Sequence, residues 1–448
     1  MNRIVETRFE GFMDIESIRR RVIVRPEPVV DLEALHPLVA AEIFFERLKE
    51  MYVPNEFSLN FIQEMIGLAY LHNRKVFCSE AAYAAGVFNP PDVEVSPICL
   101  NGLPGVGKSQ TIAALQKAMP PPVELTCALF EGSIELTSTW YASARGKAGG
   151  RQLLLDFVHG GGHDGRGSNS AKLLLECRRR ANRDGVSMVV LDETQHINTG
   201  MGASKVTDIL LTMTAIGPPM IYVSNYSLLH KLFGRNSEDK QRLLSEPRTM
   251  LPEDPKSQNW AEYVGECIRV SGGRIKADTN ELAAELYRST FGIKRLAVQL
   301  LKLAYIECRV AGRTRIEIED LHAAYRSSAY TSNATDVEAL QLQSINKGGR
   351  KARMDLRCPF ELPIQYKSNV VSFTRADRDM RVQERVFDSS ATAAERSVLK
   401  HIALPDEKTP AKARRRTPAL KATDADLTRA FHQYMESHSS SSDPKKPK

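Results

Sequence analysis

The sequence predicts an α/β protein in which helices cover both faces of a parallel sheet, followed by a smaller helical domain. Between residues 98 and 255, short apolar runs alternate with segments whose apolar residues recur at helical spacing. This alternation is typical of parallel sheets built from crossover connections. A glycine-rich loop joins the first apolar run to the first helix, and residues 256–335 read as helices alone.

Composition excludes several classes of protein. The chain has 448 residues, with 61 Lys and Arg against 54 Asp and Glu, so its net charge of +7 permits a nucleic-acid partner without demanding one. It has no apolar run long enough for a transmembrane helix and no secretory signal at its start, so we expect a cytoplasmic protein with no membrane partner. The seven cysteines form no CxxC pair, which disfavours a zinc site or redox dithiol.

The chain divides into four predicted parts. Residues 1–90 are expected to be a mostly helical N-terminal segment, 91–255 an αβα core, 256–335 a helical lid, and 336–448 a basic, largely flexible region. Within the core, strands are expected at 98–100, 123–130, 187–193 and 220–225, where β-branched and aromatic residues concentrate.

The loop after the first strand matches the P-loop pattern G-x-x-x-x-G-K-[ST]. Glycines let backbone amides approach phosphate closely, and the following helix points its positive N-terminus at the same anion. Lys108 is expected to bind the β- and γ-phosphates of ATP, and Ser109 to ligate Mg²⁺. The predicted nucleotide-binding residues here are Gly102, Pro104, Gly105, Val106, Gly107, Lys108, Ser109 and Gln110.

Acidic and polar residues follow two later strands. Asp192 and Glu193 end the apolar run SMVVL, and the carboxyl end of a buried parallel strand faces the phosphate crevice. We expect Asp192 to bind Mg²⁺ and Glu193 to orient or polarise the attacking water. Ser224 and Asn225 end the next strand; Asn225 is preferred as a contact to the γ-phosphate or the water, because an amide both donates and accepts.

Together these motifs resemble the AAA+ ATPases, which combine an αβα core with a helical lid. The segment LDETQHI at 191–197, the stretch VSNYSLLHKLF and the helical GIKRLAVQLLKLAYIECR look like the transposition regulators of the TnsC/TniB type. The resemblance spans about residues 90–330 and places a sensor cation at the start of a lid helix, at Lys294 or Arg295, with Arg295 preferred. It also implies an arginine finger, for which Arg235, Arg242 and Arg248 are candidates; Arg242 is preferred, with Arg248 next.

The resemblance implies an ATP-hydrolysing, DNA-binding regulator of transposition. Such proteins assemble on double-stranded DNA as rings or filaments when ATP is bound, connect a target selector of the TniQ/TnsD type to a TnsB-like transposase, and disassemble on hydrolysis. A prokaryotic, nucleoid-associated location while on DNA follows. Two alternatives remain open: a replication-initiator or helicase-loader-like ATPase, and a defence or signalling scaffold that binds ATP without hydrolysing it. The Asp192–Glu193 pair argues against the scaffold.

The residues after the second predicted strand are the candidate DNA contacts. Arg145, Lys147 and Arg151 are separated by small residues, which lets the backbone lie close to a phosphate chain. Thr137 and Ser138 are expected to add hydroxyl contacts. In related ATPases this segment faces the central pore, and a solvated loop is the competing interpretation. We expect His196 to be a packed or hydrogen-bonded side chain rather than a base.

Overall fold

The computed structural model describes residues 7–91, 95–126, 132–147, 149–159, 169–198, 202–345 and 353–390. The chain forms two compact units, Met1–Val382 and Gln383–Lys448. Everything below concerns the first unit. The predicted flexible tail beyond residue 390, the loop at 160–168 and the end of the predicted strand at 123–130 lie outside the described residues. No described helix is both long and apolar enough to cross a membrane.

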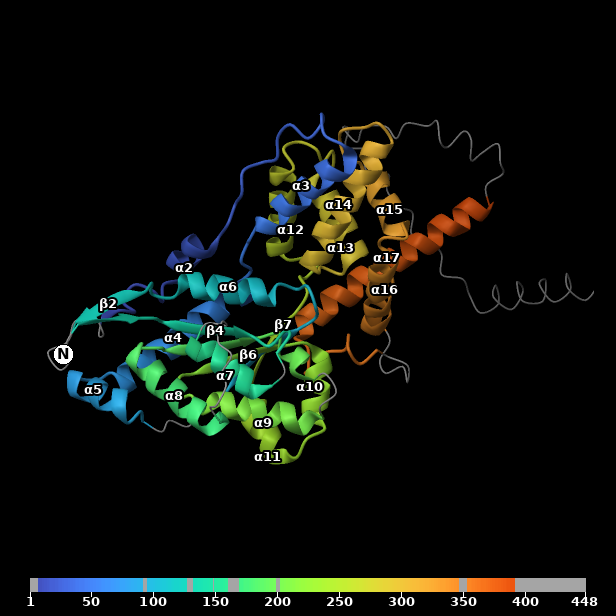
Figure 1. Cartoon of the computed structure of the whole chain (residues 1–448). Coiled ribbons are helices and arrows are strands. Elements are labelled where there is room, and N and C mark those ends of the chain that lie inside the picture. Colours follow the sequence, from blue (N-terminus) through green and yellow to red (C-terminus); the bar gives the residue numbers. More distant parts are fainter. Residues whose placement is uncertain are drawn as a thin grey trace, which may run out of the picture. The chain divides into compact units, whose positions relative to one another are not determined.

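The core is a five-stranded parallel sheet in the order β4-β5-β6-β1-β7 (Figure 1). Each strand is short and, apart from the edge strands, fully buried, which is why its sequence reads as an uninterrupted apolar run. The fold class predicted from the sequence is therefore confirmed. The strands are β4 (Thr139–Ser143), β5 (Met188–Asp192), β6 (Met220–Ser224), β1 (Ile98–Gly102) and β7 (Glu246–Met250).

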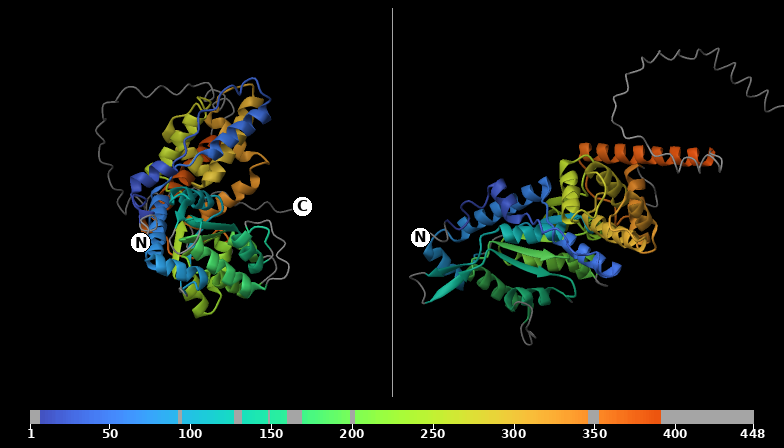
Figure 2. Two further views of the ribbon diagram at one scale, coloured as in Figure 1. Left: turned by 60° about the vertical axis from the view of Figure 1, so that its left-hand side comes forward. Right: turned by 90° about the horizontal axis from the view of Figure 1, so that it is seen from above.

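Helices cover both faces of this sheet (Figures 1 and 2). Alternate residues along a strand point to opposite faces, so Leu100 and Val190 pack in one apolar cluster, whereas Cys99 and Leu191 pack in another. The first face is covered by α2 (Ile15–Val22), α4 (Glu56–Val76) and α6 (Lys108–Ala118). The second is covered by α7 (Gly150–His159), α8 (Ser170–Arg183), α9 (Ala203–Thr214), α10 (Tyr226–Phe233) and α11 (Ser237–Leu243).

The lid is all helical and has its own core, centred on Trp260, Tyr287 and Tyr305. Side chains of Ser257 and Asp278 accept hydrogen bonds from the first turns of two of its helices, which is the usual way a helix start is satisfied. The lid comprises α12 (Gln258–Val270), α13 (Thr279–Thr290), α14 (Lys294–Val310), α15 (Ile318–Arg326) and α16 (Thr331–Ile345).

The N-terminal segment joins both parts rather than standing apart. Helices α2 and α4 pack against the sheet, and α3 (Pro37–Glu50) packs against the lid through Phe44 and Leu48. The small helix α5 (Glu80–Phe88) lies against α8. The helices of the first predicted part, residues 1–90, are therefore divided between the apolar core at the sheet and the apolar core of the lid.

Two local expectations are wrong. Residues 123–126 form β2 (Val123–Thr126), which pairs with β3 (Ser133–Leu136) in an antiparallel hairpin outside the sheet. The strand that does join the sheet is β4, which carries TWYAS. In addition, the helical part extends past residue 335: α17 (Ile364–Ser390) packs on the lid, where Arg288 pairs with Asp377 and the rings of Phe373 and Tyr287 lie 4.8 Å apart.

Candidate functional site

The glycine-rich loop is held between β1 and α6. Gly107 precedes α6 with φ of 115°, and Gly105 has φ of 85°; both are conformations that side chains other than glycine rarely adopt. A Cβ on Gly105 would lie 2.8 Å from Nε of Arg295. The loop therefore needs glycine both for its backbone angles and because the lid approaches it closely.

Lys108 begins α6 and is only 8% exposed. Its Nζ donates to the carbonyl oxygens of Gly102 and Leu103, at 2.9 and 2.8 Å, and to Oδ1 of Asn225 at 2.9 Å. Burial lowers the pKa of Lys108 to about 7; Asp192 opposes this shift and Arg295 adds to it. A polyphosphate bound beside this amine would favour its ammonium form, so the geometry suits anion binding.

Asp192 and Glu193 lie at the carboxyl end of β5. Asp192 is 3% exposed, and its carboxylate accepts from the Tyr141 hydroxyl at 3.4 Å and from the Glu193 amide at 2.7 Å. Burial, followed by the Asp192 charge, raises the pKa of Tyr141 to about 12, so this phenol remains a donor. Glu193 itself has φ of 58°, a strained conformation for a residue with a side chain.

The segment after Glu193 holds its carboxylate in place. Oε2 of Glu193 accepts from Nε2 of Gln195 at 3.1 Å and lies 2.8 Å from Nε2 of His196. Thr194 anchors the turn by donating its hydroxyl to the carbonyl of Val223 at 2.7 Å. The expectation that His196 is hydrogen-bonded agrees with this contact, but its partner, the predicted catalytic glutamate, was not anticipated.

Of the two polar residues after β6, Asn225 faces the site. Its side chain accepts from Lys108, and it also precedes α10. Ser224 is completely buried. The preference for Asn225 therefore has a geometric basis in the contact with Lys108, although its role stays a prediction.

The start of α14 distinguishes the two lid cations. The backbone amide of Arg295 donates to the carbonyl of Gly105 at 3.2 Å, and the Arg295 side chain lies against the same glycine. Lys294 instead forms a buried ion pair with Glu253 at 2.9 Å, where Asn55 also donates at 2.8 Å. Lys294 therefore joins the lid, the core and the N-terminal segment through this ion pair. It lines the same cavity as the loop, whereas Arg295 lies directly against the loop at Gly105.

One cavity of about 560 Å³ brings these groups together. Its polar wall combines loop and strand-end residues, and its apolar wall comes from α3 and the lid. The sequence did not single out the apolar wall, because only the packing of α3 on the lid places it there. The lining includes Pro104, Gly105, Gly107, Lys108, Ser109, Gln110, Asp192, Glu193, Asn225 and Arg295, together with Arg145, Gln195, His196, Phe45, Leu48, Met51, Tyr263 and Val298.

The donor set in this cavity fits Mg²⁺ bound with a nucleotide. Magnesium takes one or two protein oxygens and completes its shell with phosphates and water, and the Ser109 hydroxyl and Asp192 carboxylate line the same cavity. Among the described residues no group of three or more His, Cys, Asp or Glu side chains is placed to hold a metal ion by itself. The two remaining loop residues, Gly102 and Val106, are buried beneath the loop instead of lining the cavity.

The finger candidates lie away from this cavity. Arg242 is 55% exposed on α11 and lies 3.2 Å from Glu238, whereas Arg235 pairs with Asp239 at 2.8 Å. Arg248, on β7, donates to Glu64 at 3.0 Å. All three pair with acids of their own chain, so action on a neighbouring copy requires those pairs to exchange. Arg242 remains the preferred candidate because its pair is the most exposed.

The predicted DNA contacts do not form one loop. Thr137 precedes β4 and Arg145 follows it, so they lie at opposite ends of this strand. Ser138 is buried and donates to the carbonyl of Pro120 at 2.7 Å, which rules out the hydroxyl contact expected of it. The cause is the unanticipated β2–β3 hairpin, which turned a predicted loop into two strands.

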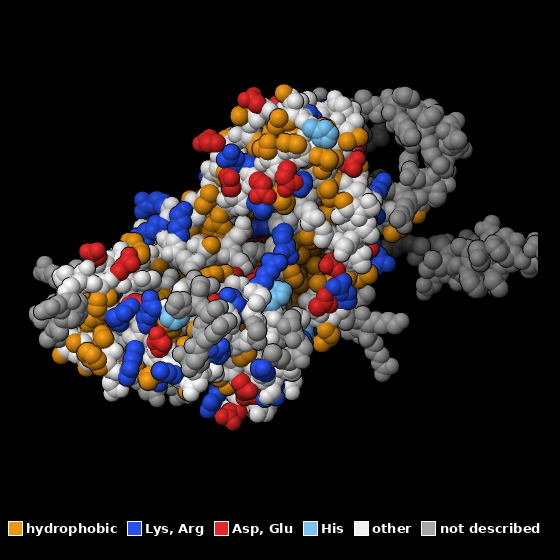
Figure 3. Space-filling view, viewed as in Figure 1, with side chains coloured by type: hydrophobic (Ala, Val, Ile, Leu, Met, Phe, Trp, Pro, Cys, Tyr) orange, Lys and Arg blue, Asp and Glu red, His pale blue; other side chains and the backbone are white. Residues whose placement is uncertain are grey.

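The remaining basic candidates, Arg145, Lys147 and Arg151, follow the carboxyl end of β4. Lys147 pairs with Asp156 at 2.7 Å, Arg145 lines the nucleotide cavity, and Arg151 lies in the first turn of α7. On the face shown in Figure 3, Lys and Arg side chains occupy several separate groups interspersed with acids. A DNA-binding surface on this chain therefore remains a prediction that rests on Arg145, Lys147 and Arg151.

Comparison with known proteins matches part of this chain to solved structures at low sequence identity. No family model matches the chain, and no curated protein matches its sequence. The ORC2 protein of Aeropyrum pernix in ADPNP–ADP complexes is 13% identical over 67% of this chain and 77% of that chain, with a TM-score of 0.42. ORC1 of the same organism in complex with DNA is 16% identical over 67% and 82%, with a TM-score of 0.38. The RuvB Holliday junction branch migration motor of Thermotoga maritima is 13% identical over 62% and 74%, with a TM-score of 0.32.

Replacing Gly105 with alanine tests the close approach of the lid. We expect Gly105→Ala to weaken ATP binding by roughly tenfold or more and to destabilise the fold by about 1–3 kcal/mol, because it combines a left-handed backbone with a collision against Arg295. Gly312→Ala is the matched control, since Gly312 also has a positive φ, of 74°, but no neighbour within 4 Å of an added Cβ. Equal effects of the two substitutions on ATP affinity, measured by calorimetry, would contradict the prediction.

Proposed function

We propose that this chain is an AAA+ ATPase that converts ATP and water to ADP and phosphate. The observation that carries the proposal is the convergence of Lys108, Ser109, Asp192, Glu193 and Arg295 on one cavity. These residues come from two core segments, the start of α6 and the end of β5, and from the lid, and nucleotide hydrolysis is the chemistry that needs all of them at once. In this proposal Mg²⁺, when bound, neutralises phosphate charge.

Each residue then has a distinct task. Loop amides between Gly105 and Lys108 and the start of α6 receive the phosphates, and Lys108 exchanges its contacts with the carbonyls of Gly102 and Leu103 for phosphate oxygens. Glu193 accepts a proton from the attacking water or orients it, with Gln195 holding its carboxylate. The opposite wall suits a flat apolar base, because it is built from aromatic and aliphatic side chains of α3 and the lid, including Phe45, Tyr263 and Val298.

Hydrolysis in this proposal drives a conformational switch. Arg295 and the Gly105 carbonyl join the lid to the loop directly, and Asn225 joins β6 to Lys108. Loss of the γ-phosphate removes an anion from between these groups, so the lid and the core separate more easily. A neighbouring copy's arginine, with Arg242 preferred, is proposed to complete the site in an assembly.

The finer proposal is a regulator of DNA transposition of the TnsC/TniB type. It rests on the DETQH segment, in which Thr194 anchors the turn and Gln195 and His196 contact Glu193. On this proposal the chain assembles on double-stranded DNA as a ring or filament with ATP, contacts a TniQ/TnsD-like selector and a TnsB-like transposase, and disassembles on hydrolysis.

One experiment tests the activity and its DNA dependence together. ATPase rate and sedimentation are measured with and without double-stranded DNA, across a range of salt concentrations. We expect DNA to accelerate hydrolysis, ATP to cause assembly, and each lysine or arginine contact to phosphate to steepen the salt dependence by about 0.9 in log–log slope. If DNA changes neither signal, the transposition proposal is wrong even where ATP is hydrolysed, and a chain that does not bind ATP overturns the whole function.

A further inference from the structure

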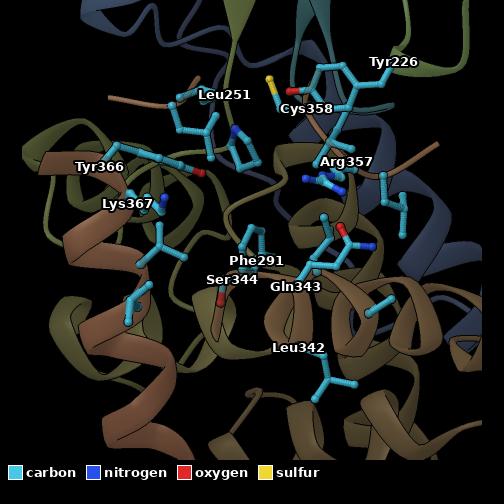
Figure 4. Close-up of a pocket in the computed structure, with 18 of the residues that line it drawn as sticks. Tyr226, Leu251, Phe291, Leu342, Gln343, Ser344, Arg357, Cys358, Tyr366 and Lys367 are labelled. Carbon is cyan, nitrogen blue, oxygen red and sulfur yellow. The ribbon is translucent and has the colours of Figure 1, made fainter. Parts of the chain in front are cut away.

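Figure 4 shows a second cavity, of about 810 Å³. The two cavities share no lining residue. Its walls come from α10, the residues after β7, the end of α13, α16, the segment 353–362 and the first turns of α17. Its volume is within the range of small-molecule sites, roughly 300–1,000 Å³.

Most of this cavity is apolar. Its lining includes buried side chains from every one of its walls, among them Leu103, Phe291, Leu340, Leu356 and Val370. These side chains belong to the same apolar cluster as β1 and α6. A cavity of this size in such a cluster suits an aliphatic or aromatic body, because burial of apolar surface is the main source of affinity.

The polar groups of the cavity point to an anion. The hydroxyl of Tyr366 is buried, and none of the described residues offers it a hydrogen-bond partner. Arg357 and Lys367 also line the cavity, and among the described residues neither side chain is paired with an acid. Arg353 is different, because Asp336 and Asp355 hold it. Glu361 is the single carboxylate on the lining, and Glu361, Arg357 and Lys367 are all exposed residues.

We propose that this cavity binds a small amphipathic carboxylate, with its apolar body among Leu340, Leu356 and Val370. The carboxylate would lie between Arg357 and Lys367, with the Tyr366 hydroxyl as a third donor. A charge-assisted hydrogen bond is roughly twice as strong as a neutral one, and two cations without acidic partners favour an anion over a neutral or cationic ligand.

The cavity is positioned to affect the nucleotide site. Leu103 lines it with its side chain, while its carbonyl accepts from Lys108 at 2.8 Å. Tyr226 lines it and directly follows Asn225, the other partner of Lys108. Ligand in the cavity is therefore expected to change ATP affinity, and by linkage ATP changes ligand affinity by the same factor. This coupling, unlike the binding itself, rests on the proposed function.

Calorimetry with decanoate, decanol and decylamine tests the chemistry of the ligand. The three probes share one chain and differ only in charge. We expect decanoate to bind the nucleotide-free protein and to raise its melting temperature, and to bind about tenfold or more tightly than decanol or decylamine. Equal affinity for decanoate and decanol, or no binding of decanoate, overturns the proposal.

Variants locate the site. Arg357→Ala and Lys367→Ala are each expected to weaken decanoate binding by roughly tenfold and to leave decanol unaffected. Arg378→Ala, an exposed position on the same helix α17 outside the cavity, is the matched control and should change nothing. Leu342→Trp, at an exposed position on the rim, should block all three probes without disturbing a buried side chain. Unchanged decanoate affinity in all these variants places the binding elsewhere and overturns the proposal.

Two further measurements separate this inference from the proposed function. Lys108→Ala should bind decanoate as the unaltered chain does, so failure of ATP binding leaves the cavity testable by itself. Saturating decanoate should shift the ATP dissociation constant in the unaltered chain but not in Leu342→Trp. A shift that persists in Leu342→Trp would show that decanoate acts outside this cavity and would contradict the coupling.

Discussion

Lys108→Ala is expected to lower ATP affinity by about a hundredfold or more and to abolish hydrolysis. The amine of Lys108 donates to three oxygens in the cavity, and the residue is buried. Its removal leaves phosphate charge without its main counterion, while the loop backbone itself is unchanged. Equilibrium binding of ATP and steady-state phosphate release measure the two effects.

Lys117→Ala is the control for this prediction. Lys117 is an exposed lysine on the same helix, α6. Lys117→Ala therefore changes the net charge and the helix composition as Lys108→Ala does, but at a position that does not line the cavity. Its ATP affinity should match that of the unaltered chain. Near-normal ATP binding by Lys108→Ala would mean that the cavity is not a triphosphate site.

Glu193→Gln is expected to lower the hydrolysis rate by about 10²–10⁴-fold while ATP binding is kept. An amide retains the shape of the side chain and still accepts hydrogen bonds from Gln195 and His196 through its oxygen, but it cannot take a proton from water. Because hydrolysis is what reopens the assembly in the proposed function, this variant should also remain assembled with ATP. Single-turnover hydrolysis and sedimentation measure the two outcomes.

Glu281→Gln, an exposed glutamate on α13, removes the same charge from a surface remote from the cavity and should leave both signals unchanged. If Glu193→Gln hydrolyses ATP at the normal rate, Glu193 is not the group that activates water. If Glu193→Gln loses ATP binding as well, the negative charge of Glu193 is needed for binding and not only for the hydrolysis step.

Sequence reasoning succeeded where the signal is local. The loop from Gly102 to Ser109 has a spacing dictated by backbone geometry around phosphate. Asp192 ends, and Asn225 follows, a buried strand of five residues. Parallel strands align their carboxyl ends at one edge, so these motifs converge whenever the alternation of strands and helices is recognised. The helical lid was predicted for the same reason, from periodicity.

Sequence reasoning failed where the outcome depends on which elements pair. Residues 123–126 have the composition of a strand and form one, but their partner is β3 and not the sheet. The sequence of a four-residue strand does not show whether it pairs in a hairpin or in the main sheet, because strand pairing depends on packing against residues distant in the sequence. The buried position of Ser138, whose hydroxyl donates to the carbonyl of Pro120, was missed for the same reason, whereas Thr137 stays a predicted DNA contact.

The sequence alone determined a P-loop core with an acidic strand end and a helical lid, because residue spacing and apolar periodicity over a few residues predict each of these features. The tertiary structure decided which side chains complete the cavity. Only folding places α3 beside the lid, directs Arg295 and not Lys294 toward Gly105, and joins His196 to Glu193. Some of these contacts join residues distant in the sequence, and the others depend on the direction of a turn. The packing of the apolar faces of the helices and the sheet against one another determines both the long-range contacts and the turn directions.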